Sequence, residues 1–191
     1  MKYTQISSIL ALLTVFTMAC KTEMVEKFDE LALPTGGYMR TVTPFPVAAT
    51  TFNVSKANMA GTKMELVAEA VTPNLGALFS SYDLSIKFVD ATPANGTKTT
   101  VVLPLRSIPA SAYAKDPTTG YPRLTLVVTG AEALTATQLT NADVLAGDRF
   151  EITATMKLTD GKSFNAANTG VNITGGAFYS SPFFYRLNVV N

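Results

Sequence analysis

The sequence predicts an all-β fold, an antiparallel β-sandwich of about seven to nine strands. Two observations predict it. Thr occurs 27 times among 191 residues and only 15% of the residues are charged, a composition that favours a β-rich exported protein. From residue 38 onward, short runs that alternate between apolar and polar residues are separated by turn residues. The sequence shows no internal repeat and no strand–helix alternation of the kind that builds a parallel sheet.

The first 19 residues are predicted to be a signal peptide. Lys2 gives a short basic start, residues 6–19 carry no charge and are mostly apolar, and the small residue Ala19 ends the run. The apolar run is shorter than the roughly 20 residues that a membrane-spanning helix needs. We therefore expect residues 1–19 to be removed during export.

Cys20, the single Cys of the chain, directly follows Ala19 and resembles the lipidated Cys of a bacterial lipoprotein. In that family the Cys becomes the first residue of the mature protein and carries the acyl chains; Thr17 departs from the family, which most often has Leu there. The alternative is an ordinary signal peptide followed by a chance Cys. Residues 20–37 contain charges, one Pro and two adjacent Gly without a regular period. We expect a lipidated Cys and a flexible tether over residues 20–37, followed by a β-sandwich domain over residues 38–191.

The first half of the domain contains four runs that we interpret as strands. The first is broken by Pro and is expected at a sheet edge, whereas the last two alternate with a period of two, as in half-buried strands. The expected strands are residues 41–47, 50–54, 62–71 and 82–89.

The second half continues this pattern. Asn95-Gly96 is a turn pair, so the run that follows it is expected to fold back as a hairpin. Residues 109–120 read as a polar loop, and residues 130–145 have room for one or two helical turns. The expected strands are residues 98–106, 123–128, 149–158, 162–164 and 183–190.

Residues 145–150, Leu-Ala-Gly-Asp-Arg-Phe, resemble the corner before the sixth strand of immunoglobulin and fibronectin type III domains. In those families an aromatic residue at the corner, usually Tyr, points inward, and its hydroxyl bonds back to the corner backbone. Phe150 stands at that position and has no hydroxyl, so we expect the corner to rest on packing. The resemblance implies an immunoglobulin-like or fibronectin III-like sandwich.

The composition excludes several kinds of catalytic site. Without His there is no Ser-His-Asp triad and no His metal ligand, and one Cys forms neither an internal disulfide nor a zinc site. The net charge of +1 offers no basic surface for nucleic acid. A glycosidase needs two carboxylates that face one cleft. The carboxylates that lie closest together in the sequence are Asp143, Asp148, Glu151 and Asp160, and their positions are explained by turn formation or by exposure to solvent. We predict no enzyme, no cofactor and no metal, with Ca²⁺ between turn carboxylates as the alternative.

Tyr113, Tyr121 and Tyr179 are the candidate ligand-binding residues, because aromatic rings beside polar loop residues can stack against sugars. Tyr113 and Tyr121 flank the polar loop, and Tyr179 lies in a Gly-, Ser- and Pro-rich segment. The alternative is that these rings lie at the edge of the sandwich and bind no ligand.

Taken whole, the chain resembles small Bacteroidetes lipoproteins, some of which are encoded beside starch-utilisation-type nutrient-uptake pairs. The signal through Cys20, the Gly-Asp-Arg-Phe corner at residues 147–150, the turn at residues 160–164 and the Gly-rich segment at residues 175–183 carry the resemblance. It implies a lipid-anchored outer-membrane protein on the cell surface or periplasmic face, acting as an accessory in glycan uptake. The alternative is a structural adhesin or interaction subunit that pairs through sandwich edges or loops.

Overall fold

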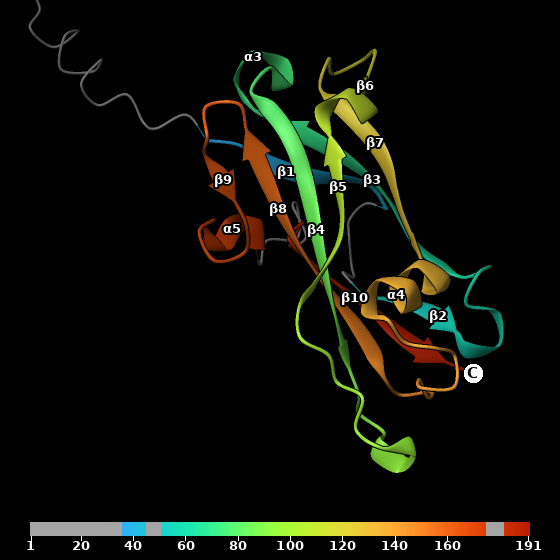
Figure 1. Ribbon diagram of the computed structural model, residues 1–191. Coiled ribbons are helices and arrows are strands. Elements are labelled where there is room, and N and C mark those ends of the chain that lie inside the picture. Colours follow the sequence, from blue (N-terminus) through green and yellow to red (C-terminus); the bar gives the residue numbers. More distant parts are fainter. Residues whose placement is uncertain (1–35, 45–50, 175–181) are drawn as a thin grey trace, which may run out of the picture. The chain divides into compact units, whose positions relative to one another are not determined.

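The computed structural model describes residues 36–44, 51–174 and 182–191, and in them the chain forms two packed β-sheets (Figure 1). These residues belong to a unit that runs from Gly36 to Asn191. The predicted signal peptide, Cys20, nearly all of the predicted tether and Tyr179 lie outside the described residues. None of the helices in the described part of the chain has both the length and the apolar character needed to cross a membrane.

Sheet A has the strand order β1-β3-β7-β6, and all its neighbouring strands are antiparallel. Sheet B has the order β2-β10-β8-β4-β5, and β9 pairs with the end of β8. Sheet A consists of β1 (Tyr38–Thr43), β3 (Lys63–Val71), β7 (Pro122–Thr129) and β6 (Ala114–Lys115). Sheet B consists of β2 (Thr51–Ser55), β10 (Phe184–Val190), β8 (Arg149–Leu158), β4 (Phe79–Val89), β5 (Leu103–Pro109) and β9 (Ser163–Phe164).

In residues 36–44, 51–174 and 182–191, three short α-helices and three 3₁₀ turns connect the strands. The helix α4 follows β7 directly, and the hydroxyl of Thr129 caps it by accepting a hydrogen bond from the Glu132 N–H at 3.1 Å. The α-helices are α3 (Pro73–Gly76), α4 (Gly130–Thr137) and α5 (Val171–Thr174), and the 3₁₀ turns are η1 (Lys56–Asn58), η2 (Pro93–Asn95) and η3 (Ala110–Ala112).

The strand order confirms the predicted immunoglobulin-like sandwich. Sheet A follows the A-B-E-D order of that fold, and sheet B follows the G-F-C order extended by C′. The first strand is divided between the sheets, since β1 pairs with β3 in sheet A whereas β2 pairs with β10 in sheet B. The β2–β10 pair is parallel, which departs from a purely antiparallel sandwich.

The strand predictions based on a period of two agree closely with the observed strands β3, β4, β8 and β10. Along β8 and β10 every second residue is buried, and these residues form one core with the inward side chains of sheet A. The structure also contains two strands of only two residues each, β6 and β9, which are too short to show a period.

The run after Asn95-Gly96 pairs back antiparallel with β4, as predicted, but the tight Asn-Gly turn predicted to connect them is wrong. Asn95 ends the 3₁₀ turn η2, and Gly96 has φ 89° and ψ 150°, which is not the conformation of a tight hairpin turn. The Asp90 carboxylate accepts hydrogen bonds from the N–H groups of Thr92 and Lys98, at 2.9 and 2.8 Å, and so holds a wide loop. The antiparallel pairing of β4 with β5 begins only at Leu103, opposite Ile86.

The corner before β8 is held by hydrogen bonds as well as by packing. The Phe150 ring is fully buried and lies 5.1 Å from the Phe88 ring, measured between centroids. The fully buried Asp148 carboxylate accepts hydrogen bonds from Leu145 N–H at 2.7 Å, Ala91 N–H at 2.9 Å and Thr92 N–H at 3.0 Å. Asp148 therefore joins the corner to the loop after β4, a role that the sequence pattern did not reveal.

Phe150→Ala is expected to lower the free energy of unfolding by about 3–5 kcal/mol, because it leaves a cavity in the core. Thr153→Ala, an exposed change on the same strand, is the control and should stay within about 0.5 kcal/mol. Urea denaturation measures both. An effect of Phe150→Ala no larger than that of the control would contradict the buried position of this ring.

Asp148→Asn is expected to lower the free energy of unfolding by about 1–3 kcal/mol, because an amide N–H₂ would face the Leu145 N–H. Burial alone would raise the pKa of Asp148, but hydrogen bonds from Leu145, Thr92 and Ala91 outweigh it and hold the pKa below its ordinary value. The carboxylate therefore stabilises the fold above the unfolded-state pKa of about 4, and this contribution is lost as the pH falls through the lowered pKa.

Urea titrations at several pH values measure the effect. The difference in stability between wild type and Asp148→Asn should shrink as the pH falls below about 4. Glu65→Gln, at an exposed position on β3, is the matched control. A difference that does not depend on pH would contradict the role of the ionised carboxylate.

Candidate interaction site

Of the predicted tyrosines, Tyr113 does not present a ring face for sugar stacking. Tyr113 is only 8% exposed, and its ring packs edge-on against Phe79 with centroids 4.8 Å apart. Tyr121 is half-buried and lies in the turn before β7. Tyr179 lies outside the described residues. Because the Tyr113 ring fills the core, neither of its faces is available to a ligand.

A surface hollow of about 390 Å³ lies between the start of β1 and the segment around β9 and α5. Tyr38, Phe164 and Ile173 supply its apolar side chains. Its polar side chains are already bonded: Asn168 accepts from Asn165 N–H at 2.8 Å, and Thr169 donates to the Asn165 carbonyl oxygen at 2.7 Å. The hollow therefore has few free polar side-chain groups that could form hydrogen bonds to a ligand and fix its orientation.

Most carboxylates of the described residues form ion pairs with Lys or Arg. The strongest case is Glu69, fully buried on β3 between Arg40 on β1 and Arg123 on β7, both of which bond to it. Arg123 also pairs with Asp116. Every resolved shift of a carboxyl pKa in the described residues is downward; the groups are Asp83, Asp116, Asp143, Asp148, Glu151 and Asp160. Three or more His, Cys, Asp or Glu residues do not converge as metal ligands anywhere in this part of the chain.

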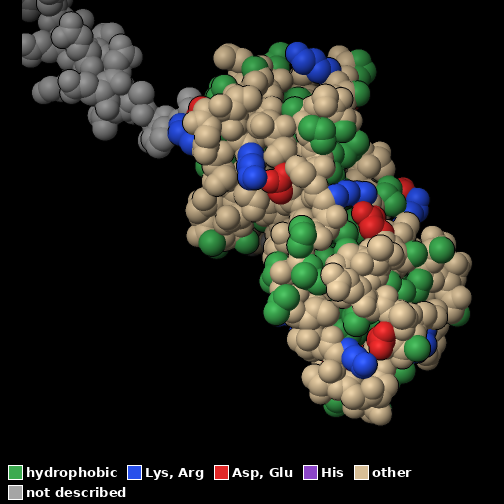
Figure 2. All heavy atoms as spheres, in the orientation of Figure 1, with side chains coloured by type: hydrophobic (Ala, Val, Ile, Leu, Met, Phe, Trp, Pro, Cys, Tyr) green, Lys and Arg blue, Asp and Glu red, His purple; other side chains and the backbone are tan. Residues whose placement is uncertain are grey.

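The surface charges also do not gather into one large patch on the face shown in Figure 2. Basic and acidic side chains on that face mostly lie next to one another and are scattered over it. Ion pairs such as Lys98–Asp143 at 3.3 Å and Arg106–Glu132 at 3.1 Å are of this kind. Because these pairs are partly exposed to solvent, their contribution to stability is small, and the two charges of each pair neutralise one another.

The most unusual feature is the edge of β7. The short strand β6 pairs with only Arg123 and Pro122 at the beginning of β7. Over residues 124–129, β7 pairs with β3 on one side, and no strand of the described residues pairs with its other side. In Figure 1, β6 lies at one end of β7 and α4 at the other, so that the unpaired stretch is bounded at both ends.

This unpaired edge opens into a groove of about 300 Å³ between β7 and β5, which we call the edge groove. Leu124, Thr125 and Val127 line it on the β7 side, and residues 106–109 line it on the β5 side. Ile108, only 7% exposed, supplies an apolar floor. The groove thus runs across the open side of the sandwich, between two strand edges that belong to different sheets.

Arg106 crosses the edge groove. Its Nη2 donates to the Val127 carbonyl oxygen, and its Nη1 lies 3.1 Å from Glu132 Oε1 on α4. Because the N–H and C=O groups of one strand residue point to the same side and alternate along the strand, Thr125 also directs its backbone groups into the groove. Thr125 is exposed, and no bond partner for its backbone on this side is found within the described residues.

No protein-family model matches this chain, and no curated protein matches it. Among solved structures, it is similar to AggA, the major subunit of aggregative adherence fimbriae type I from Escherichia coli. The match has 9% sequence identity and a TM-score of 0.28, and covers 82% of this chain and 95% of AggA. A likeness at this level carries no conclusion about function.

Proposed function

We propose that this chain is a non-catalytic interaction module, held at a bacterial envelope by a lipid on Cys20, that binds an extended segment of a partner protein along β7. The observation that supports strand addition is the unpaired β7 edge beside the edge groove. In strand addition, backbone hydrogen bonds supply the affinity, and pockets for alternate side chains supply the specificity.

The two edges that face the groove differ in how they are protected. On β5, Pro104 and Pro109 are exposed and lack an N–H, and Pro is a common device against pairing at an edge. Residues 124–128 of β7, Leu-Thr-Leu-Val-Val, contain neither Pro nor charge. An unprotected edge of this composition is suited to receive a strand.

The partner segment must fit the chemistry of the groove. Leu124, Val127 and Ile108 offer apolar contacts, so every second residue of the bound segment should be apolar. Arg106 already bonds to Val127 and Glu132, so a bound strand would replace the Arg106–Val127 bond. The accessory role in glycan uptake is a second candidate, and the three basic residues around Glu151 on the outer face of sheet B, Lys87, Arg149 and Arg186, favour it.

The strand-addition proposal is tested with peptides selected by display from a library of alternating apolar and polar residues. Thr125→Pro removes one N–H from the free edge and should weaken binding of the selected peptides by about tenfold or more. Thr125→Ala keeps the N–H and is the matched control, expected to bind within about twofold of wild type. Isothermal titration calorimetry measures the affinities, and near-UV circular dichroism checks that both variants are folded.

A second experiment changes the peptide and uses the wild-type protein, so its result does not depend on whether a variant folds. Methylation of alternate peptide nitrogens should abolish binding in one register, where the N–H groups face β7, and be tolerated in the other. Equal effects of the two methylation patterns, or equal binding by Thr125→Pro and Thr125→Ala, would refute pairing with β7.

The anchor is tested separately. In a Gram-negative host, wild-type protein should incorporate labelled palmitate and sediment with the outer membrane, because acyl chains on Cys20 contribute about 0.8 kcal/mol for each buried CH₂. Cys20→Ala should lose both the label and the membrane association. Mass spectrometry that finds Cys20 absent from, or unmodified in, the mature wild-type protein would contradict the anchor.

A further inference from the structure

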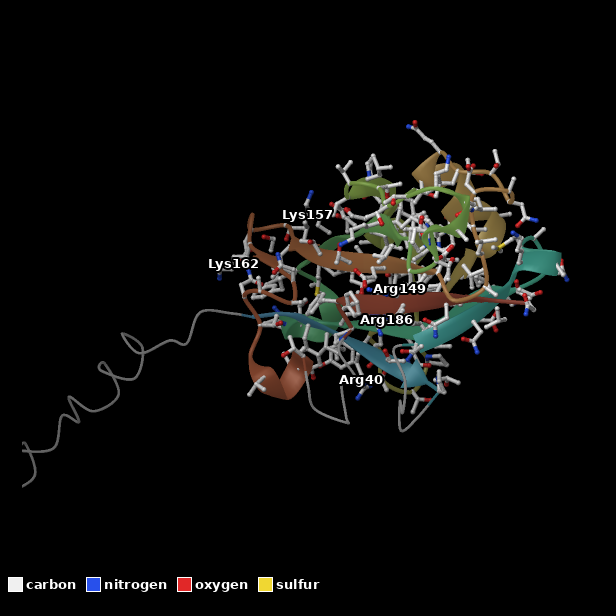
Figure 3. The ribbon with its side chains drawn as sticks, turned by 90° about the horizontal axis from the view of Figure 1, so that it is seen from below. Arg40, Arg149, Lys157, Lys162 and Arg186 are labelled. Atoms are coloured by element: carbon white, nitrogen blue, oxygen red, sulfur yellow. The ribbon has the colours of Figure 1, made fainter. Side chains whose placement is uncertain are left out.

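The outer face of sheet B carries three basic residues around one carboxylate. Lys87 on β4 and Arg186 on β10 both lie directly opposite Glu151 on β8 in the strand register. Lys87 Nζ lies 3.7 Å from Glu151 Oε2, and Arg149 Nε donates to Glu151 Oε1 at 2.8 Å. We call Lys87, Arg149 and Arg186 the basic cluster; Figure 3 shows Arg149 and Arg186 on their neighbouring strands.

The basic cluster has more positive charge than its surroundings neutralise. Burial would raise the pKa of Glu151, but the hydrogen bond from Arg149 and the charges of Arg149, Lys87 and Arg186 outweigh it and lower the pKa. Glu151 is therefore ionised at neutral pH, and one negative charge faces three positive ones. Asp83, the next carboxylate on this face of β4, is paired with Lys157 at 2.6 Å.

Among the described residues, Arg186 differs from the other arginines in having no hydrogen-bonded partner there. Arg40, Arg106, Arg123 and Arg149 each bond to a carboxylate or a carbonyl oxygen. Within the described residues, no hydrogen bond or ion pair of Arg186 is found, and its Nε is buried without a partner. Its guanidinium carbon lies 5.9 Å from the centroid of the Phe184 ring. A half-buried guanidinium with unused donors is suited to bind an anion.

The residues next to the basic cluster are aromatic and hydroxylic. In the strand register, Phe184 on β10 and Ser85 on β4 both lie opposite Thr153 on β8, one row along the same face. Phe184 is half-buried and Thr153 is exposed. A row of cations therefore lies beside a row with one ring and two hydroxyl groups, on a sheet surface made by the three adjacent strands β10, β8 and β4.

We propose that this face binds an acidic polysaccharide, with the carboxylate of a uronic acid residue on Arg186 and the basic cluster and a neighbouring sugar ring against Phe184. A carboxylate fits the fork of a guanidinium. The apolar face of a pyranose fits an aromatic ring, and its hydroxyl groups fit Thr153 and Ser85. An acidic peptide would use the charges but would not need this combination, which is why the ring and hydroxyl row favour the polysaccharide.

The test uses the domain from Gly36 onward, which contains all the described residues, with polygalacturonate as the probe. Wild type should bind polygalacturonate, bind a neutral galactan at least about tenfold more weakly, and lose affinity as the NaCl concentration rises. Arg186→Gln and Phe184→Ala should each weaken binding by about tenfold. Lys157→Gln, on the same face of β8 but paired with Asp83, is the matched control and should change the affinity by less than about twofold.

Three results would overturn the proposal: no binding of polygalacturonate by wild type, equal effects of Arg186→Gln and Lys157→Gln, or poly-L-glutamate binding as tightly as polygalacturonate with no effect of Phe184→Ala. Unfolding midpoints of the variants show whether a loss of binding reflects a loss of fold. Thr125→Pro should bind polygalacturonate like wild type, because β7 belongs to the other sheet. Failure of strand addition and failure of this proposal are therefore separate results.

Discussion

A buried backbone N–H or C=O group needs a hydrogen-bond partner, and an exposed strand edge is free to find one in another chain. Over residues 124–129, β7 pairs with a strand on only one side within the described residues. The cause is the length of β6, which has two residues and therefore leaves the open side of sheet A uncovered. Arg106 reaches across from sheet B and satisfies one carbonyl oxygen, but a single side chain does not replace a strand. The edge groove, and with it the proposed binding of an extended segment, exists because β6 pairs with only the first two residues of β7.

Much of the sandwich is predictable from the sequence, because burial on one face leaves a period of two in β3, β4, β8 and β10. Long-range contacts are not predictable in this way. Asp148 is expected from the sequence to be an ordinary turn residue, yet it is fully buried and bonded to the loop after β4. Glu69 is likewise fully buried and bonded to Arg40 and Arg123 on the two neighbouring strands. The edge groove was missed because it depends on a strand too short to detect, although a Leu-Thr-Leu-Val-Val run without Pro or charge was a visible signal.

The two proposed surfaces use different physical interactions and belong to different sheets. The edge groove on sheet A offers backbone hydrogen bonds and an apolar floor, so its affinity should depend little on salt. The basic cluster on sheet B offers charge, so its affinity should fall as salt screens the cations. A module with both surfaces has the means to hold a protein partner and an acidic glycan at once. Around Asp83, Asp148 and Glu151, hydrogen bonds and neighbouring cations outweigh burial and lower the pKa of each carboxyl below its ordinary value.

Amide hydrogen exchange, followed residue by residue with NMR, tests the central claim most directly. In the free domain, the Thr125 amide should exchange much faster than the amides of Leu126 and Val128, whose backbone groups face β3. With a selected peptide bound, Thr125 should become protected while Leu126 and Val128 change little. A Thr125 amide that is already protected in the free domain, or that stays unprotected in the complex, would contradict strand addition at β7.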